Sequence, residues 1–127
     1  MALVLLTPDR LAESARDALS DRRNQLWLSV ASEWEIVIKF SLGRLALPEP
    51  PSTFLPSRLA ATDCGVLPVE QHHVLRLELL PALHGDVFDR MLIAQAMADD
   101  LAIVTGDPAF PPYNVPVVWA AKDTPRT

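Results

Sequence analysis

Four acidic residues stand where helices and strands of this chain are expected to begin or end. Glu35 lies within a largely apolar stretch, Asp86 and Asp89 are three residues apart, and Asp107 follows an apolar run. Carboxylate oxygens that gather at one place are the ligands of hard divalent cations, so these residue types predict a site for Mg²⁺ or Mn²⁺. Such a site could activate a water molecule for hydrolysis.

Each of these residues also has a purely structural explanation. Glu35 suits the positive end of a helix dipole. Asp86 and Asp89 suit the N-cap and the third position of a helix, and Arg90 would pair with Asp86 in an ordinary i,i+4 bridge. Asp107 precedes a proline and suits a turn. Each explanation is by itself the more common one, but three such places near strand ends of one sheet favour a shared function.

Other kinds of site find less support. His72 and His73 are neighbours on an expected helix and should point away from each other, and His84 has no second ligand at a useful spacing. The single Cys64 excludes an internal disulfide and a cysteine-based zinc site. Only 4 glycines are present, and they form no phosphate-binding loop.

Length and composition predict one cytoplasmic domain. At 127 residues the chain can bury a core, and 50% hydrophobic residues with a mean hydropathy of +0.18 suit a buried parallel sheet or a surface that a partner covers. No apolar run reaches the roughly 18 residues of a membrane span. A net charge of −5 argues against a protein that coats nucleic acid in general, but a nuclease is compatible with it.

The apolar pattern predicts alternating helices and strands. Helices are expected at residues 11–20, 31–42, 52–62, 70–80 and 86–99, and strands at 26–28, 66–69, 101–105 and 115–119. Ser29 or Ser32 should cap the second helix. This alternation predicts an α/β sandwich with a mostly parallel sheet, in which sites gather beyond the carboxyl ends of strands. Asp107 is placed there.

Several of these segments together resemble a known family. The stretches are Ser29-Val-Ala-Ser-Glu-Trp-Glu-Ile-Val-Ile-Lys39, Leu42-Gly-Arg-Leu45, Asp86-Val-Phe-Asp-Arg-Met-Leu-Ile-Ala-Gln-Ala96 and Val104-Thr-Gly-Asp-Pro-Ala-Phe110. In this order and spacing they resemble a PIN-domain protein, most of all the VapC-like toxins of bacterial type II toxin–antitoxin systems. The resemblance extends over residues 5–119. It implies a PIN-like three-layer sandwich spanning residues 1–127 as a single domain.

The resemblance also implies an activity and a set of site residues. It implies an endoribonuclease that uses Mg²⁺ or Mn²⁺ to hydrolyse RNA phosphodiesters. Glu35, Asp89 and Asp107 match the family's second, third and fourth metal-binding acids. Asp86 matches a frequent accessory acid, and Thr105 matches a hydroxyl position beside the last acid. Arg90 also matches a family position, whose role the sequence does not indicate.

Partners follow from the same resemblance. The family's partner is a small antitoxin whose tail covers the groove and often places a basic side chain in the acidic pocket, and family members are usually homodimers. The expected helix 31–42 carries Trp34, Ile38 and Phe40, which is more apolar surface than a small sheet can bury alone. We expect part of this helix to line an antitoxin groove or a dimer contact.

The N-terminus departs from the family pattern. Family members open with an apolar strand ending in Asp-Thr-His or a similar motif, whereas residues 2–11 resemble the segment just after it. We therefore expect a domain that is N-terminally incomplete and lacks the first, central strand and the first acid. Either the start is misplaced, or the protein is a degenerate copy. In a third option residues 3–6 take the strand's place and Asp9 approximates the missing acid, although residues 11–19 align better with the family's helix.

Two functions remain open at this point. The first is a metal-dependent ribonuclease toxin, impaired by the loss of one acid, so that residues 1–127 should cut RNA weakly or not at all. The second is a catalytically inactive interaction protein that still binds an antitoxin. In-frame codons for a strand ending in Asp-Thr-His just upstream of Met1 would favour the enzyme, and a stop codon there would favour the inactive protein.

Overall fold

The computed structural model describes residues 2–8, 24–81, 86–105 and 117–119. Five strands form one sheet in the order β3-β2-β1-β4-β5, and every neighbouring pair is parallel. The strands are β1 (Ala2–Leu6), β2 (Asn24–Ser29), β3 (Cys64–Leu67), β4 (Ala102–Thr105) and β5 (Val117–Trp119). The expected parallel α/β architecture is therefore confirmed.

The expectation that the sheet lacks a central strand is wrong. β1 lies between β2 and β4, with Leu5 opposite Trp27 on one side and Ile103 on the other. The physical reason is the run of apolar residues after Met1, which suits a strand that is buried on both faces. Leu5 and Leu6 have no exposed surface. Asp9 and the expected helix 11–20 lie outside the described residues.

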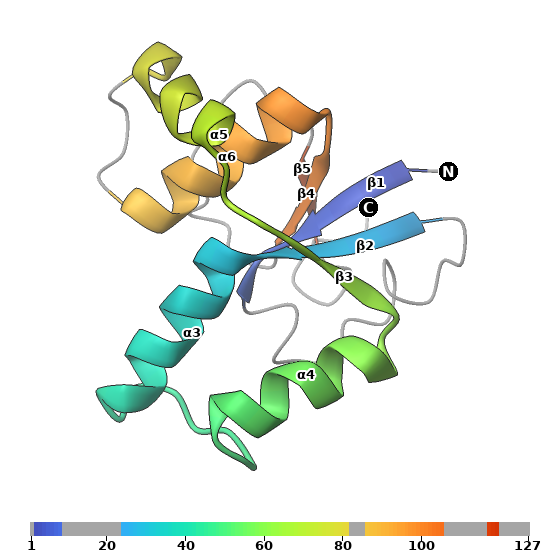
Figure 1. Ribbon diagram of the computed structural model, residues 1–127, viewed down its shortest axis with the longest axis vertical. Coiled ribbons are helices and arrows are strands. Elements are labelled where there is room, and N and C mark those ends of the chain that lie inside the picture. The colour runs from blue at the N-terminus through green and yellow to red at the C-terminus, as the bar shows by residue number, and fades with distance from the viewer. Residues whose placement is uncertain (1, 9–23, 82–85, 106–116, 120–127) are drawn as a thin grey trace.

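Helices cover both faces of the sheet and make it a three-layer sandwich (Figure 1). The helices are α3 (Val30–Ser41), α4 (Pro51–Ala61), α5 (Gln71–Arg76), the 3₁₀ helix η1 (Leu77–Leu79) and α6 (Val87–Asp99). Leu6 and Val104 pack with α3 and α4 in one apolar cluster, whereas Leu5 and Ile103 pack with α6 in the other. Successive strand residues thus feed opposite layers, as a pleated sheet requires.

Two expected elements have different bounds in the structure. The helix expected at 70–80 changes to 3₁₀ geometry at Leu77 and ends before Leu80, which is extended (ψ 138°) because a proline follows it. The strand expected at 66–69 is instead Cys64–Leu67, since β2 offers its last pairing residue, Ser29, opposite Leu67. Pro68 has no N–H to continue the ladder. Across the described residues no helix has the length and apolarity to span a membrane.

Candidate active site

The carboxyl edge of the sheet carries buried hydroxyl side chains. Thr7, Ser29 and Thr105 follow or end β1, β2 and β4, and each is at most 3% exposed. Ser29 is the N-cap of α3, because its Oγ accepts a hydrogen bond from the Ala31 N–H at 3.0 Å. Thr7 Oγ1 donates to the Val104 carbonyl at 3.1 Å and so ties β1 to β4. This edge fixes where α3 begins, and with it the position of Glu35.

Glu35 is nearly buried on α3 and has a cationic partner. The residue is 9% exposed, and its Oε2 lies 2.8 Å from the Lys39 Nζ one turn further along the helix. A carboxylate in this environment needs such a partner, because burial without one is costly. The expectation that Glu35 is partly buried is therefore confirmed, and Lys39 is the group that balances its charge.

Asp86 is the N-cap of α6, as its structural explanation predicts. Its Oδ1 accepts hydrogen bonds from the N–H groups of Phe88 and Asp89, both at 2.9 Å. Asp89 occupies the third position of the helix and is half-buried. The cap thus holds the Asp89 backbone in place directly. Arg90 Nη1 donates to the Pro81 carbonyl at 2.9 Å and ties the start of α6 to the end of the preceding segment.

An aromatic contact brings these two helices together. The rings of Trp34 and Phe88 meet edge to face, with centroids 5.4 Å apart. Each ring is the immediate sequence neighbour of a candidate acid, Glu35 on α3 and Asp89 on α6. The contact therefore joins the two helices that carry these acids.

Acids from both helices affect the pKa of Lys39. The pKa of Lys39 is raised above its usual value, and the largest cause is the hydrogen bond to Glu35. Partial burial acts in the opposite direction, and the negative charges of Glu35, Asp86 and Asp89 raise the pKa further. Carboxylates from α3 and from α6 thus stabilise positive charge at one place. The chemistry of this donor set suits a hard divalent cation.

The described acids do not by themselves form a closed metal site. The oxygens of Glu35, Asp86 and Asp89 do not all lie within 4.8 Å of one another. Thr105 ends β4 and is fully buried, but Asp107, two residues later, lies outside the described residues. The convergence of Asp89 and Asp107 on one cation therefore stays a prediction.

A second cluster, at the other end of α6, was not expected. His72 Nε2 lies 3.0 Å from one oxygen of Asp99, and His73 Nε2 lies 2.7 Å from the other. The ring centroids are 4.0 Å apart, so the expectation that the two rings point away from each other is wrong. The reason is that α5 packs on α6, where one carboxylate attracts both rings. His73 and Asp99 are 26 residues apart in the sequence, and no local pattern predicts a contact over such a separation. His84 lies outside the described residues.

Hydrogen bonds fix the proton of His73. The Glu70 N–H donates to His73 Nδ1 at 3.0 Å, and Gln95 Nε2 lies 3.4 Å from the same nitrogen. Nδ1 is therefore an acceptor, and in the neutral ring Nε2 carries the hydrogen that Asp99 accepts. A nitrogen used in this way is not available to a metal. The cluster joins α5 to α6, about 20 Å along the helix from Asp86 for its 13 residues.

Cys64 offers no reactive thiolate. Burial, followed by the nearby charges of Glu33 and Asp63, raises the pKa of its thiol to about 12. The thiol therefore stays protonated at neutral pH.

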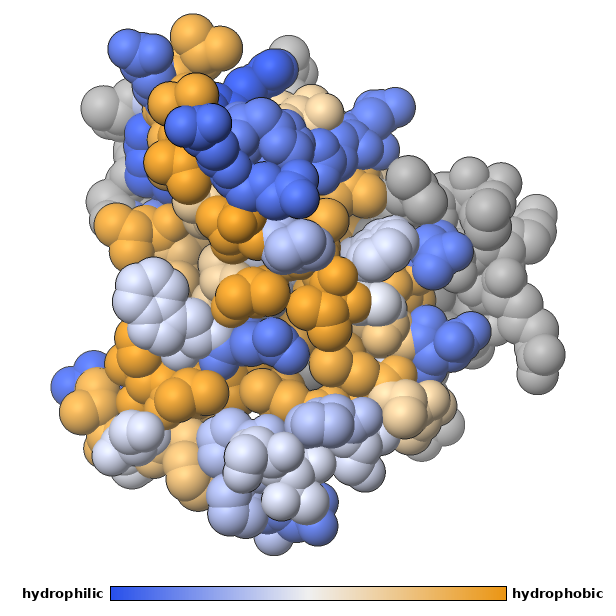
Figure 2. Space-filling view, in the orientation of Figure 1, coloured by the Kyte–Doolittle hydropathy of each residue, from blue (hydrophilic) through white to orange (hydrophobic). Residues whose placement is uncertain are grey.

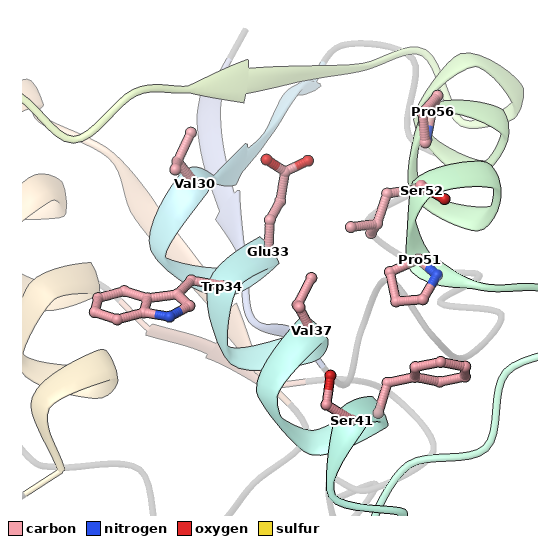
Figure 3. Close-up of a pocket in the computed structure, with 10 residues that line it drawn as sticks. Val30, Glu33, Trp34, Val37, Ser41, Pro51, Ser52 and Pro56 are labelled. Atoms are coloured by element: carbon pink, nitrogen blue, oxygen red, sulfur yellow. The ribbon is translucent and has the colours of Figure 1, made fainter.

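An apolar pocket opens between α3 and α4, with a volume of about 670 Å³ (Figure 3). Glu33 and Val37 lie on the side of α3 that is nearer to Pro51 and Ser52 of α4, and Trp34 extends from the other side of α3. The full lining is Val30, Glu33, Trp34, Val37, Phe40, Ser41, Pro51, Ser52, Leu55 and Pro56.

Trp34 is 63% exposed, so the expectation of surplus apolar surface on this helix is confirmed for that residue. Burial raises the pKa of the Glu33 carboxyl, the acidic group of the pocket wall. Figure 2 shows apolar surface across the middle of the face seen in Figure 1.

Comparison with known proteins gives three kinds of match. A family model for the PIN domain matches residues 1–114. Ribonuclease VapC16 of Mycobacterium tuberculosis is 40% identical over 68 residues, which are 54% of this chain and 46% of that protein. The chain thus spans about half the length of this curated relative.

Two solved structures share the fold. VapBC2 from Rickettsia felis, bound to a DNA fragment from its promoter, matches with a TM-score of 0.67 and 12% identity over 92% of this chain and 98% of that one. A toxin–antitoxin complex from Klebsiella pneumoniae matches with a TM-score of 0.55 and 16% identity over 91% of this chain and 95% of that one.

Proposed function

The chain belongs to the PIN domain family, and on this basis we propose that it is a metal-dependent endoribonuclease toxin of a type II toxin–antitoxin system. The observation that carries the proposal is the placement of the acids: the nearly buried Glu35 of α3 and Asp86 and Asp89 at the start of α6 lie on helices that pack together through the Trp34–Phe88 contact. The 40% identity to a ribonuclease supports RNA as the substrate. Such a toxin would act in the cytoplasm.

In this proposal each residue has a defined part. Glu35, Asp89 and Asp107 would hold Mg²⁺ or Mn²⁺, with Asp86 as an accessory acid and Thr105 beside the last acid. When bound, the ion supplies an activated water molecule and neutralises charge on the phosphate. Asp86 fixes the first turn of α6 and thereby aims Asp89. Arg90 holds the Pro81 carbonyl and positions the segment before the helix.

The residue that follows β1 affects how strongly the protein should cleave RNA. Thr7, not an acid, follows the central strand, and Thr7 and Pro8 are the last residues described before Asp9. We therefore expect weak cleavage by residues 1–127. A catalytically inactive PIN-like protein that still binds an antitoxin is the second candidate function, and the same threonine favours it.

The test is cleavage of a structured RNA with Mg²⁺ or Mn²⁺ against an EDTA control. Asp89→Asn, which keeps shape and removes charge, should abolish cleavage, whereas Asp100→Asn, just after the same helix, should not. The assay is repeated with Thr7→Asp, which places a carboxylate directly after the central strand β1 and should strengthen cleavage. No metal-dependent cleavage in either form would reject the enzyme and leave the inactive protein.

The proposed partner is a small antitoxin, and the proposed assembly also contains a homodimer of the toxin. The pocket between α3 and α4 supports the antitoxin as a partner, because it combines apolar walls with the acidic Glu33. A partner segment with apolar side chains and a neighbouring basic residue would complement it. The two solved neighbours are described as a VapBC and a toxin–antitoxin complex.

Partner binding is tested by co-expression with the product of the neighbouring gene. We expect a stable complex and a higher melting temperature than for the toxin alone. Trp34→Ala at the pocket edge should weaken the complex, whereas Leu79→Ala, 69% exposed on η1, serves as a control for the loss of an exposed apolar side chain. Light scattering gives the oligomeric state, and a monomer whose melting temperature the neighbour leaves unchanged would contradict both proposals.

A further inference from the structure

Lys39 lies beside the acidic region formed by Glu35, Asp86 and Asp89, and the proposed function gives it no role. Its Nζ lies 2.8 Å from Glu35 Oε2. The Lys39 side chain is 51% exposed, whereas that of Glu35 is only 12% exposed. The carboxylate is therefore nearly fixed in the protein, and the ammonium group reaches it from a flexible stem that is open to solvent.

The surroundings of Lys39 differ from those of an ordinary helix ion pair. A Glu–Lys pair at i,i+4 usually involves two exposed groups on one helix. Here Glu35 is nearly buried, and α3 packs against a second helix, α6, whose first turn carries Asp86 and Asp89. The ammonium group thus meets the carboxylate that the proposed metal site would use, in the field of two further acids.

We propose that Lys39 is a built-in counter-ion that occupies Glu35 in the metal-free protein and has to leave it when a divalent cation binds. This inference rests on the proposed function, since it concerns the same acids. The two cations compete because both use the Glu35 carboxylate, and close positive charges repel each other. Lys39 then lowers the affinity of the site for Mg²⁺ and keeps the acidic region together while no metal is bound.

Variants measure this competition without RNA. The Kd for Mg²⁺ is determined by calorimetry for the full chain and for Lys39→Met, with Arg58→Met on α4 as a control that loses the same charge elsewhere. Lys39→Met should bind Mg²⁺ about three- to tenfold more tightly, given the modest strength of a half-exposed ion pair and the added repulsion. Lys39→Arg, which keeps the charge, and Arg58→Met should stay near the original value.

A spectroscopic measurement makes the test independent of variant folding. The chain has two lysines, Lys39 and Lys122, so the side-chain signals of labelled lysine can be assigned with one substitution. Saturating Mg²⁺ should shift the Lys39 Cε and Nζ signals as the ion pair opens, and leave those of Lys122 nearly unchanged. An ion pair with a purely structural role would not respond in this way.

The outcomes separate this inference from the proposed function. Mg²⁺ binding with equal Kd values in the original chain and in Lys39→Met, or with an unmoved Lys39 signal, overturns the counter-ion and leaves the metal site standing. If neither the original chain nor Lys39→Met binds Mg²⁺ or Mn²⁺, the proposed metal-dependent function fails, and the inference fails with it.

Discussion

Trp34 of α3 and Phe88 of α6 cross edge to face, with ring centroids 5.4 Å apart and ring planes at 86°. This geometry places the positive edge of one ring on the negative face of the other. Since each ring is next to a candidate acid in the sequence, the contact joins the helices that carry Glu35 and Asp89. Its loss should affect both stability and metal binding.

A double-mutant cycle measures this contact. Trp34→Ala and Phe88→Ala should show a coupling energy of about 0.5–1.5 kcal/mol in the free energy of unfolding, the usual value for an aromatic pair. Denaturant titration of the two single variants and the double variant gives the value. Trp34→Ala with Phe54→Ala on α4 is the comparison and should be additive. Additivity in the first pair as well would contradict the prediction.

Asp86 should reveal two roles that can be separated. Asp86→Ala removes the N-cap of α6 and should lower the free energy of unfolding by about 0.5–2 kcal/mol. Asp86→Ser keeps a capping oxygen and should recover most of this stability, yet still bind Mg²⁺ more weakly because the charge is gone. Thermal unfolding and calorimetry measure the two effects. Equal destabilisation by Ser and Ala would show that the cap is not what Asp86 provides.

The link between α5 and α6 should weaken in acid. Partial burial acts to raise the pKa of Asp99, but hydrogen bonds with His72 and His73 outweigh burial and lower it. The ionised carboxylate therefore stabilises the fold above the unfolded-state pKa of about 3.9, and this contribution is lost as pH falls through the lower folded-state pKa.

The check for Asp99 is the free energy of unfolding of Asp99→Asn and of the original chain between pH 3 and 7. The difference between the two should shrink below about pH 4, because the original chain alone loses an ionised Asp99 there. Glu49→Gln, at an exposed position, should leave the shape of the curve unchanged. A constant difference for Asp99→Asn at every pH would show that its charge does not matter.

Gly65 on β3 leaves room for the indole of Trp27 on β2. A Cβ at this position would lie 2.6 Å from Trp27 Cζ3, and the two residues are partners in the sheet register. Gly65→Ala should therefore cost about 1–3 kcal/mol through overpacking. In the background of Trp27→Leu the same change should cost clearly less, whereas Val66→Ala should cost the same in both backgrounds. A cost independent of Trp27 would place its origin in the backbone.

Thr7 offers a way to complete the set of acids. Thr7→Asp places a carboxylate directly after the central strand, at a position that is 3% exposed. The metal-free variant should be less stable, because this charge is buried and the hydrogen bond to Val104 is lost. Its melting temperature should rise more on adding Mg²⁺ than that of the original chain. Thr7→Asn is the uncharged control, and an equal response of both variants would exclude a metal ligand here.

Local signals sufficed for the two helices that carry the acids. Ser29 before α3 and Asp86 before α6 are capping residues in the sequence and cap these helices in the structure. Their apolar periodicity then fixed which faces are buried. Such features depend on residues within one or two turns, and a single sequence contains them completely.

Contacts between residues far apart in the sequence could not be predicted from such local signals. The place of β1 depends on pairing with both β2 and β4, and the two histidines meet Asp99 only because α5 packs on α6. The surroundings of Lys39 were missed for the same reason, since two of the three acids whose charges act on it come from another helix. Its spacing of four residues from Glu35 was the one signal available.

The position of β1 also sets the order of events during synthesis. Thr7 bonds to Val104, a residue 97 positions later, so one edge of the central strand has no partner until most of the chain has been translated. At about 5–20 residues per second this delay is roughly 5–20 s. An apolar strand with an open edge is a template for unwanted pairing during that interval. Nascent chains on the ribosome should therefore depend on chaperones until β4 emerges from the exit tunnel.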